Sequence, residues 1–184
     1  CVQAQPGYQP AKENLEARQV FINDRLGIFV HWGLYSMLGD GEWVQYNQKI
    51  DNCRYERLAN CFYPSKFDAE EWIRAFKDAG AGYVTFTSRH HEGFSMFKTA
   101  QSDYNIVDGT PFGRDVIAEL SAACQKYDFR LHLYYSHLDW HREDYWPRGS
   151  RSVNYPLGRK DGDEHSWRHY EEFMLAQLTE LLTN

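Results

Sequence analysis

Short apolar runs in this chain alternate with longer segments whose apolar residues recur at helical spacing. Three runs, at 26–30, 83–87 and 129–135, are rich in apolar, β-branched or aromatic residues and predict strands. The run at 26–30 is almost continuously apolar, which is typical of a parallel strand buried on both faces. These runs supply three candidate strands for one sheet.

Helical periodicity is found before the first strand and after each of the three. Asp68 precedes one helical segment with Glu71 three residues later, as in a capping box, and Gly80 is the expected stop. The predicted helices are 12–23, 68–79, 114–127 and 165–183, and the longer loops are 38–64 (with a short helix), 95–113 and 138–163. Their predicted apolar positions include Leu15, Val20 and Phe21 in the first helix and Tyr170, Phe173, Met174, Leu178, Leu181 and Leu182 in the last.

The order of elements is one helix followed by three strand–loop–helix units. This alternation predicts an α/β fold with a parallel sheet and helices outside it. Residues 1–10 are polar with Pro6, Gly7 and Pro10 and predict an irregular lead-in, while 11–184 form one α/β region.

Imidazole and phenol side chains recur where the predicted strands end. His31 follows the first strand, His90 and His91 follow the second, and Tyr134 and His137 lie at the end of the third. A barrel of parallel strands carries its active site at this edge. Three clusters at matched positions favour a functional site over three unrelated core histidines.

Alternation within the third strand indicates which face is polar. Leu131 and Leu133 share one face, while His132 and Tyr134 share the other. We expect the apolar face to meet the helices and the Tyr134 hydroxyl to point inward. In the loop after the first strand, Glu42 and Trp43 add a carboxylate and a flat ring, which together suit a sugar.

Composition narrows the function. The chain has 20 Lys and Arg against 26 Asp and Glu, and no basic stripe suits a nucleic acid. No apolar run reaches the roughly 18 residues that a transmembrane helix needs. Aromatic residues make up 16% of the chain, which serves either a large core or a sugar-binding cleft.

The cysteines give information about the cellular compartment of the protein. No CxxC pair predicts a structural zinc site. Cys53 and Cys61 could pair in an oxidising compartment or remain free thiols, and both readings stay open. Cys1 suggests the lipid-modified first residue of a bacterial lipoprotein, residues 2–4 suggest the end of a secretory signal, and a cloning remnant is the third reading. We therefore expect export, to the periplasm or to a lipid-anchored position at the outer membrane.

Several motifs, in order from about residue 8 onward, resemble the family 29 glycoside hydrolases, the α-L-fucosidases. The specific ones are His31-Trp32-Gly33 and His90-His91-Glu92-Gly93-Phe94. The others are the run at 25–30, Glu42-Trp43, the segments at 67–72 and 77–81, Arg114-Asp115 and Leu133-Tyr134-Tyr135-Ser136.

The resemblance implies the N-terminal part of a (β/α)8 TIM barrel and a retaining exo-glycosidase that removes terminal α-L-fucose from glycans. By position, it implies that the fucose pocket is lined by His31, Glu42, Trp43, His90, His91 and Tyr134. In such enzymes one carboxylate attacks the sugar and a second carboxylic acid protonates the leaving oxygen. No cofactor is implied, because two carboxylates suffice.

The resemblance places both catalytic carboxylates beyond Asn184, at the next strand end and further on. A closed barrel needs about 200–250 residues or more, and three strands alone leave unpaired edges. We therefore expect the natural polypeptide to continue, and residues 1–184 alone to be weakly stable or self-associating.

Two alternatives remain. Eight His residues could serve a metal-dependent barrel hydrolase, although the adjacent His90 and His91 should diverge on extended backbone and HExxH is absent. A non-catalytic fucose-binding protein would keep the rings without the catalytic carboxylates. None of the other candidate carboxylates matches the family nucleophile. Glu92 could orient an imidazole, Asp139 could contact substrate, and Asp115 could supply a charge at a helix N-terminus. The remaining candidates are Asp108 and Glu164.

Overall fold

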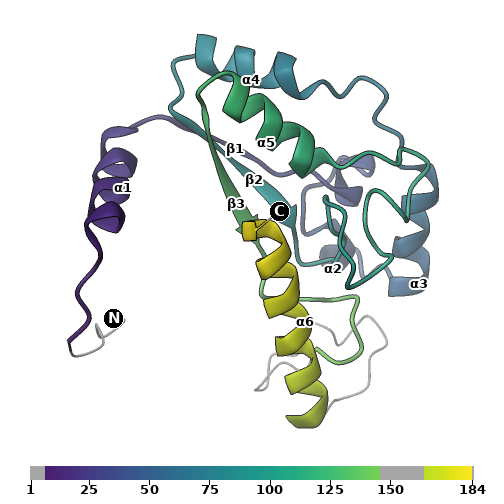
Figure 1. Cartoon of the computed structure of the whole chain (residues 1–184). Coiled ribbons are helices and arrows are strands. Elements are labelled where there is room, and N and C mark those ends of the chain that lie inside the picture. The colour runs from purple at the N-terminus through teal and green to yellow at the C-terminus, as the bar shows by residue number, and fades with distance from the viewer. Residues whose placement is uncertain (1–6, 146–163, 184) are drawn as a thin grey trace.

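The computed structural model describes residues 7–145 and 164–183, and it contains one small sheet with helices around it (Figure 1). The strands are β1 (Gly27–Val30), β2 (Tyr83–Arg89) and β3 (Arg130–Tyr135). The α-helices are α1 (Lys12–Asn23), α2 (Val44–Asn47), α3 (Asn52–Tyr55), α4 (Ala69–Asp78), α5 (Val116–Lys126) and α6 (Glu164–Thr183), and the 3-10 helices are η1 (Leu34–Met37) and η2 (Glu56–Cys61).

The sheet is parallel throughout, in the order β1-β2-β3. Val30 lies beside Phe86, and Phe86 lies beside Leu133, so the three strands end at one edge. The predicted α/β fold with a parallel sheet is therefore confirmed.

Helices α4 and α5 lie side by side over one face of the sheet (Figure 1). Val84 and Phe86 of β2 are fully buried on that face, where Ile73 of α4 and Leu120 of α5 belong to the same core cluster. Leu131 and Leu133 pack against this cluster as their alternation predicted.

Both helices begin at aspartate caps. The Asp68 carboxylate accepts a hydrogen bond from the Glu71 N–H, and the Asp115 carboxylate accepts one from the Ala118 N–H, each at 2.9 Å. Each cap satisfies a backbone donor that has no partner within its helix. Asp115 therefore acts as a helix cap, as the sequence indicated.

Within the described residues, the strand at 26–30 is covered on one face only, not on both as predicted. Phe29 is 53% exposed, because α4 and α5 cover only one face of the sheet. We call the other side the open face. It carries Phe29, Tyr83, Thr85, Thr87, His132 and Tyr134, as the strand alternation and ring contacts indicate.

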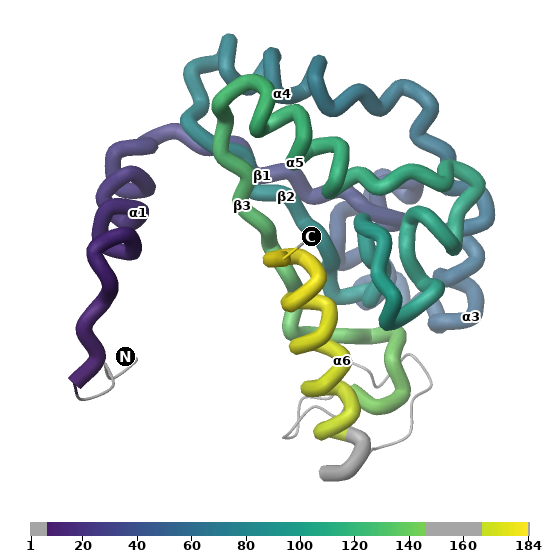
Figure 2. The backbone as a smooth tube through the Cα atoms, in the orientation of Figure 1, coloured from purple at the N-terminus to yellow at the C-terminus, as the bar shows by residue number. Residues whose placement is uncertain are grey.

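Helix α1 has the predicted bounds but no buried residue, so its predicted apolar face is not part of the core. Leu15, Val20 and Phe21 are all exposed. Figure 2 shows the helix standing to one side of the rest of the chain. The Phe21 ring lies 5.6 Å from those of Tyr83 and His132, at the start of the open face.

Helix α6 buries Tyr170 and Phe173 as predicted, but Leu182 is 79% exposed. The fully buried position near its C-terminus belongs instead to Gln177, whose amide donates to Ser95 and Thr99 and accepts from the Tyr135 hydroxyl. A polar residue can replace an apolar one here because every polar atom of its amide has a partner.

Cys53, Cys61 and Cys124 are free thiols, and Cys53 and Cys61 are exposed, so the unpaired reading of these two holds in this structure. Cys1 lies outside the described residues, as does the greater part of the predicted loop at 138–163. Within the described ranges, no helix combines the length and apolar character needed to cross a bilayer.

Candidate active site

The predicted site residues meet at the C-terminal edge of the sheet. The His90 ring lies 4.1 Å from the His91 ring, 5.5 Å from the His31 ring and 5.6 Å from the Tyr134 ring, between centroids. The Trp43 ring lies 4.9 Å from the His91 ring. We call His31, His90, His91 and Tyr134 the imidazole cluster. It draws on all three strand ends.

A bulge in β2 places His90 in this cluster. Thr87 lies beside Tyr134, but Arg89 lies beside Tyr135, so the register slips at Ser88. An extra residue moves every later side chain to the opposite face. Without the bulge Arg89 would share the open face with Thr87. With it, Arg89 turns to the side of Tyr135, and His90 lies beside Tyr134.

The chain turns immediately after this bulge. The Gly93 N–H donates to the His90 carbonyl at 3.0 Å, and Gly93 has φ of +79°, where a side chain is unfavourable. The prediction that His90 and His91 diverge is wrong, because β2 ends at Arg89 and the pair lies in this turn, not on extended backbone.

The charge of Glu42 acts on two residues of the imidazole cluster, His91 and Tyr134. Its charge partly offsets the lowering of the His91 pKa, which burial brings down to about 4. The Tyr134 pKa is raised, first by burial and then by Glu42 and Glu92. The structure thus brings all six predicted sugar-binding residues to one region.

Both adjacent histidines are neutral at physiological pH. His90 is 4% exposed, and burial together with the neighbouring His91 and His31 lowers its pKa to about 3. They can therefore offer directed hydrogen bonds to a ligand, but no positive charge.

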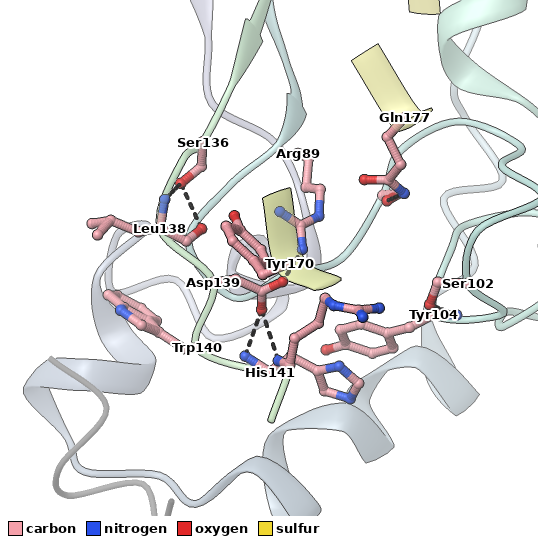
Figure 3. Close-up of polar contacts among 12 residues, drawn as sticks. Arg89, Ser102, Tyr104, Ser136, Leu138, Asp139, Trp140, His141, Tyr170 and Gln177 are labelled. Atoms are coloured by element: carbon pink, nitrogen blue, oxygen red, sulfur yellow. Dashed lines mark hydrogen bonds and ion pairs between the residues drawn. The ribbon is translucent and has the colours of Figure 1, made fainter. Parts of the chain in front are cut away.

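Ser136 contacts His91 directly, although the sequence marks it only as the last residue of the Leu133-Tyr134-Tyr135-Ser136 motif. The distance from His91 Nδ1 to Ser136 Oγ is 2.6 Å. The Ser136 hydroxyl donates to the Leu138 carbonyl at 2.8 Å and accepts from the Leu138 N–H at 3.0 Å (Figure 3).

Glu92 is the most unusual group in the region. It is 2% exposed, and burial raises its pKa to about 8, although its own backbone N–H and Arg89 oppose the rise. Its Oε2 atom lies 3.7 Å from His90 Nδ1. A Cβ on Gly33 would lie 2.9 Å from Glu92 Oε1, so the His31-Trp32-Gly33 motif ends in the residue that leaves room for this carboxyl.

Tyr35 and Thr87 were not predicted as site residues. The Tyr35 hydroxyl and Thr87 Oγ1 are 3.2 Å apart, and the Trp32 N–H donates to Thr87 Oγ1 at 3.1 Å. The Tyr35 ring lies 5.6 Å from the His90 ring. Thr87 is recognisable from the sequence as the last open-face residue of β2, whereas nothing in the sequence marks Tyr35.

The side chain of Asp139 has no exposed surface, so its predicted role as a substrate contact is wrong. It is fully buried and pairs with the equally buried Arg89 (Figure 3). Burial raises the Asp139 pKa, but Arg89 and the backbone N–H groups of Arg142 and His141 outweigh it, and the net shift is downward. Asp139 is therefore a structural anion.

The remaining candidates have other places. His137 is exposed, and its carbonyl accepts from the Tyr170 hydroxyl at 2.8 Å, so its imidazole is not part of the cluster. Asp108 pairs with Lys98. The Glu164 side chain lies outside the described residues.

No group of three or more His, Cys, Asp or Glu side chains within the described residues is arranged to hold a metal ion. A surface hollow of about 390 Å³ lies away from the cluster, between α4 and α5, and is lined by residues such as Glu70, Arg114, Glu119 and Lys126. Those four form two ion pairs, which suits a structural surface.

The whole chain, residues 1–184, matches the sequence model of the α-L-fucosidase family. Human plasma α-L-fucosidase is 34% identical over 154 residues, which cover 72% of this chain and 33% of the human protein. The chain thus spans about a third of the length of the curated relatives it matches.

Solved structures give the same result. α-L-fucosidase AlfC from Lactobacillus casei, in complex with α-L-fucose product, superposes with a TM-score of 0.76 at 32% identity and covers 90% of this chain and 58% of that one. A trapped covalent intermediate of an α-L-fucosidase from Bacteroides thetaiotaomicron superposes with a TM-score of 0.81 at 30% identity, over 98% and 40% of the two chains.

Proposed function

Because this chain belongs to the α-L-fucosidase family, we propose that the complete protein hydrolyses terminal α-L-fucose from glycans and that these residues form one side of its sugar pocket. The observation that carries the proposal is the meeting of His31, His90, His91 and Tyr134 at one sheet edge. Glu42 and Trp43 complete the set of six sugar-binding residues.

The chemistry of these groups suits a neutral sugar. Neutral imidazoles, a phenol and a carboxylate offer donors and acceptors at fixed positions, which match hydroxyl groups. An aromatic ring such as Trp43 matches the apolar face of a sugar. Hydrogen bonds that strengthen as the oxocarbenium-like state develops would lower the barrier to glycosidic cleavage.

We infer a retaining mechanism with a covalent glycosyl-enzyme intermediate. A trapped covalent intermediate of the Bacteroides thetaiotaomicron relative supports it. We propose that the nucleophile and the acid/base are supplied by residues beyond Asn184. Asp139 is fully buried in its ion pair with Arg89, Glu92 is 2% exposed beside His90, and Asp115 caps a helix. Glu42 is the carboxylate in this chain that we place next to the sugar.

We also propose that the three βα units are the first part of a (β/α)8 barrel. The open face of the sheet would then be the barrel interior. Two observations support this: all three strands are parallel, and aromatic and polar side chains share the open face.

The test is hydrolysis of 4-nitrophenyl α-L-fucoside by the complete polypeptide, beside the aryl α- and β-D-galactosides. We expect release from the fucoside alone. With a 2-fluoro-fucosyl fluoride, which slows turnover, we expect a mass increase of one 2-fluoro-fucosyl unit as the anomeric fluoride leaves. Fucose binding without release from any substrate would favour the non-catalytic sugar-binding protein. Release that depends on an added metal ion would favour the metal-dependent hydrolase.

We further propose that the protein is exported, which the name of its human plasma relative supports. Fractionation of the producing cells tests this, and activity confined to the cytosol would contradict it.

A further inference from the structure

The protons of His91 can be assigned from the contacts of Ser136. A serine hydroxyl carries one hydrogen, and this one is used toward the Leu138 carbonyl, which can only accept. The same oxygen also lies 2.6 Å from His91 Nδ1, so there it must accept. Nδ1 of His91 therefore carries the ring proton, and Nε2 is left as an acceptor.

The neighbouring imidazole faces a different partner. His90 Nδ1 and Glu92 Oε2 are 3.7 Å apart, and both are buried atoms without a hydrogen-bond partner among the described residues. Leaving two such atoms unpaired is costly, and a small shift would join them. A hydrogen bond between them needs one proton, carried either by the carboxyl or by Nδ1.

The surroundings of Glu92 favour the proton on its carboxyl group rather than on His90 Nδ1. Burial is the largest influence on its protonation, and Asp139 acts in the same direction. Arg89 opposes them, but its charge is matched by Asp139. The tyrosines that feel the Glu92 charge, namely Tyr35, Tyr55 and Tyr104, are neutral hydroxyls at physiological pH because burial raises each pKa. The carboxylic acid is thus the donor, and His90 Nδ1 is the acceptor.

We propose that Glu92 and Ser136 hold the adjacent His90 and His91 in opposite tautomers, so that the sugar site receives one N–H donor and one bare nitrogen acceptor side by side. His90 then presents Nε2–H and His91 presents an unprotonated Nε2. Neither Nε2 atom makes a hydrogen bond to the described residues. A buried atom without a partner would be unsatisfied, and neither Nε2 atom is one, so both reach the surface. Both are therefore accessible to a ligand.

The arrangement selects for hydroxyl groups. With the rings 4.1 Å apart, one sugar hydroxyl, or two neighbouring ones, can accept from His90 and donate to His91. An O-methyl ether can accept but cannot donate, and a deoxy sugar can do neither. Such a site rejects both analogues because a buried polar atom would be left unpaired. This consequence for the ligand rests on the proposed function, whereas the tautomers do not.

The direct test is long-range 1H–15N correlation on the complete polypeptide labelled with 15N-histidine, without sugar. His90→Gln and His91→Gln assign the signals. We expect the protonated nitrogen to be ε2 in His90 and δ1 in His91. The same tautomer in both rings, or a protonated and charged ring in either, overturns the proposal whatever the enzymatic activity.

Matched variants separate the positioning role from a structural one. In Glu92→Gln the amide oxygen can accept the residue's own backbone N–H, as the carboxyl does, and the NH2 can donate to His90. Glu92→Met has a similar size and no donor. We expect Glu92→Gln to keep the His90 tautomer and Glu92→Met to lose it. Ser136→Ala should release the His91 tautomer alone.

Kinetics complete the test. We expect Glu92→Met to lower kcat/KM for the aryl fucoside about tenfold or more, and Glu92→Gln to stay within about threefold of the parent. Equal losses in both variants would overturn the donor role. If the tautomers are opposite but no variant or parent hydrolyses a fucoside, the proposed function fails and the tautomer assignment stands.

Discussion

Two polar clusters lie on opposite sides of the β2 bulge and meet different physical demands. On the side of α6, Arg89 and Asp139 carry full charges that neutralise each other, and the guanidinium lies 5.3 Å from the Tyr135 and Phe173 ring centroids. In the turn that follows the bulge, His90, His91 and Glu92 have pKa values shifted so that each group is neutral.

The difference separates a structural cluster from the candidate functional one. Arg89 and Asp139 are both fully buried, and each neutralises the charge of the other. The neutral cluster keeps the two Nε2 atoms accessible, so part of its hydrogen-bonding capacity remains for a ligand. A buried polar group is evidence of a site only when its capacity is not already used.

The largest expected effect comes from breaking the charged pair. Asp139→Ala should lower the free energy of unfolding of the complete polypeptide by about 3–5 kcal/mol, because Arg89 is left buried and unpaired. Denaturant titration measures this. Glu119→Ala, which breaks the exposed pair with Arg114, is the control and should cost about 1 kcal/mol or less. Equal costs would show that Arg89 finds another partner.

The turn between the clusters comes next. Gly93→Ala forces a side chain onto φ of +79° and puts its Cβ 2.7 Å from Asp139 Oδ1. We expect a loss of about 2–3 kcal/mol in the free energy of unfolding. Gly113→Ala has φ of +63° and open space, so it isolates the backbone strain at about 1 kcal/mol. Similar losses at both positions would mean that Asp139 moves away freely.

The neutral cluster predicts a pH-dependent stability. Glutamate in the unfolded chain has a pKa of about 4.3, against about 8 for Glu92 in the folded state. In this interval the folded state binds a proton that the unfolded state has lost, so stability falls as pH rises. His90 and His91, with folded pKa values of about 3 and 4, act oppositely, but only up to the unfolded histidine pKa, about 6.5.

Between pH 6.5 and 8 the Glu92 effect therefore remains alone, and it amounts to at most about 2 kcal/mol. Thermal unfolding of the complete polypeptide across this range measures it. Glu92→Gln does not titrate and should flatten the decline. If the stability of that variant falls by the same amount, groups other than Glu92 cause the decline.

The smallest contrast compares neighbours on opposite faces. Tyr135→Phe removes a 2.7 Å hydrogen bond to the buried Gln177 and should cost about 1 kcal/mol of stability without changing fucoside hydrolysis. Tyr134→Phe should change stability by less than about 0.5 kcal/mol and raise KM or lower kcat. A loss of stability in Tyr134→Phe together with a loss of activity in Tyr135→Phe would contradict this assignment of the two faces.

Much of the site was predictable because local rules govern it. The aspartate caps at 68 and 115 follow from residue type and position. The placing of His31 and Tyr134 follows from strand ends that lie at one edge of a parallel sheet. The role of Asp139 was not predictable, because its partner Arg89 is fifty residues away and reaches it only through the bulge.

The sequence by itself determined the order of elements, the strand alternation and the motifs that place the chain in its family, because each depends on neighbours within a few residues. The tertiary structure decided which face each polar group meets. One extra residue at Ser88 sends Arg89 toward α6 and His90 toward the open face. Burial then decided that Glu92 and the two histidines are neutral, since desolvation depends on every element packed around them.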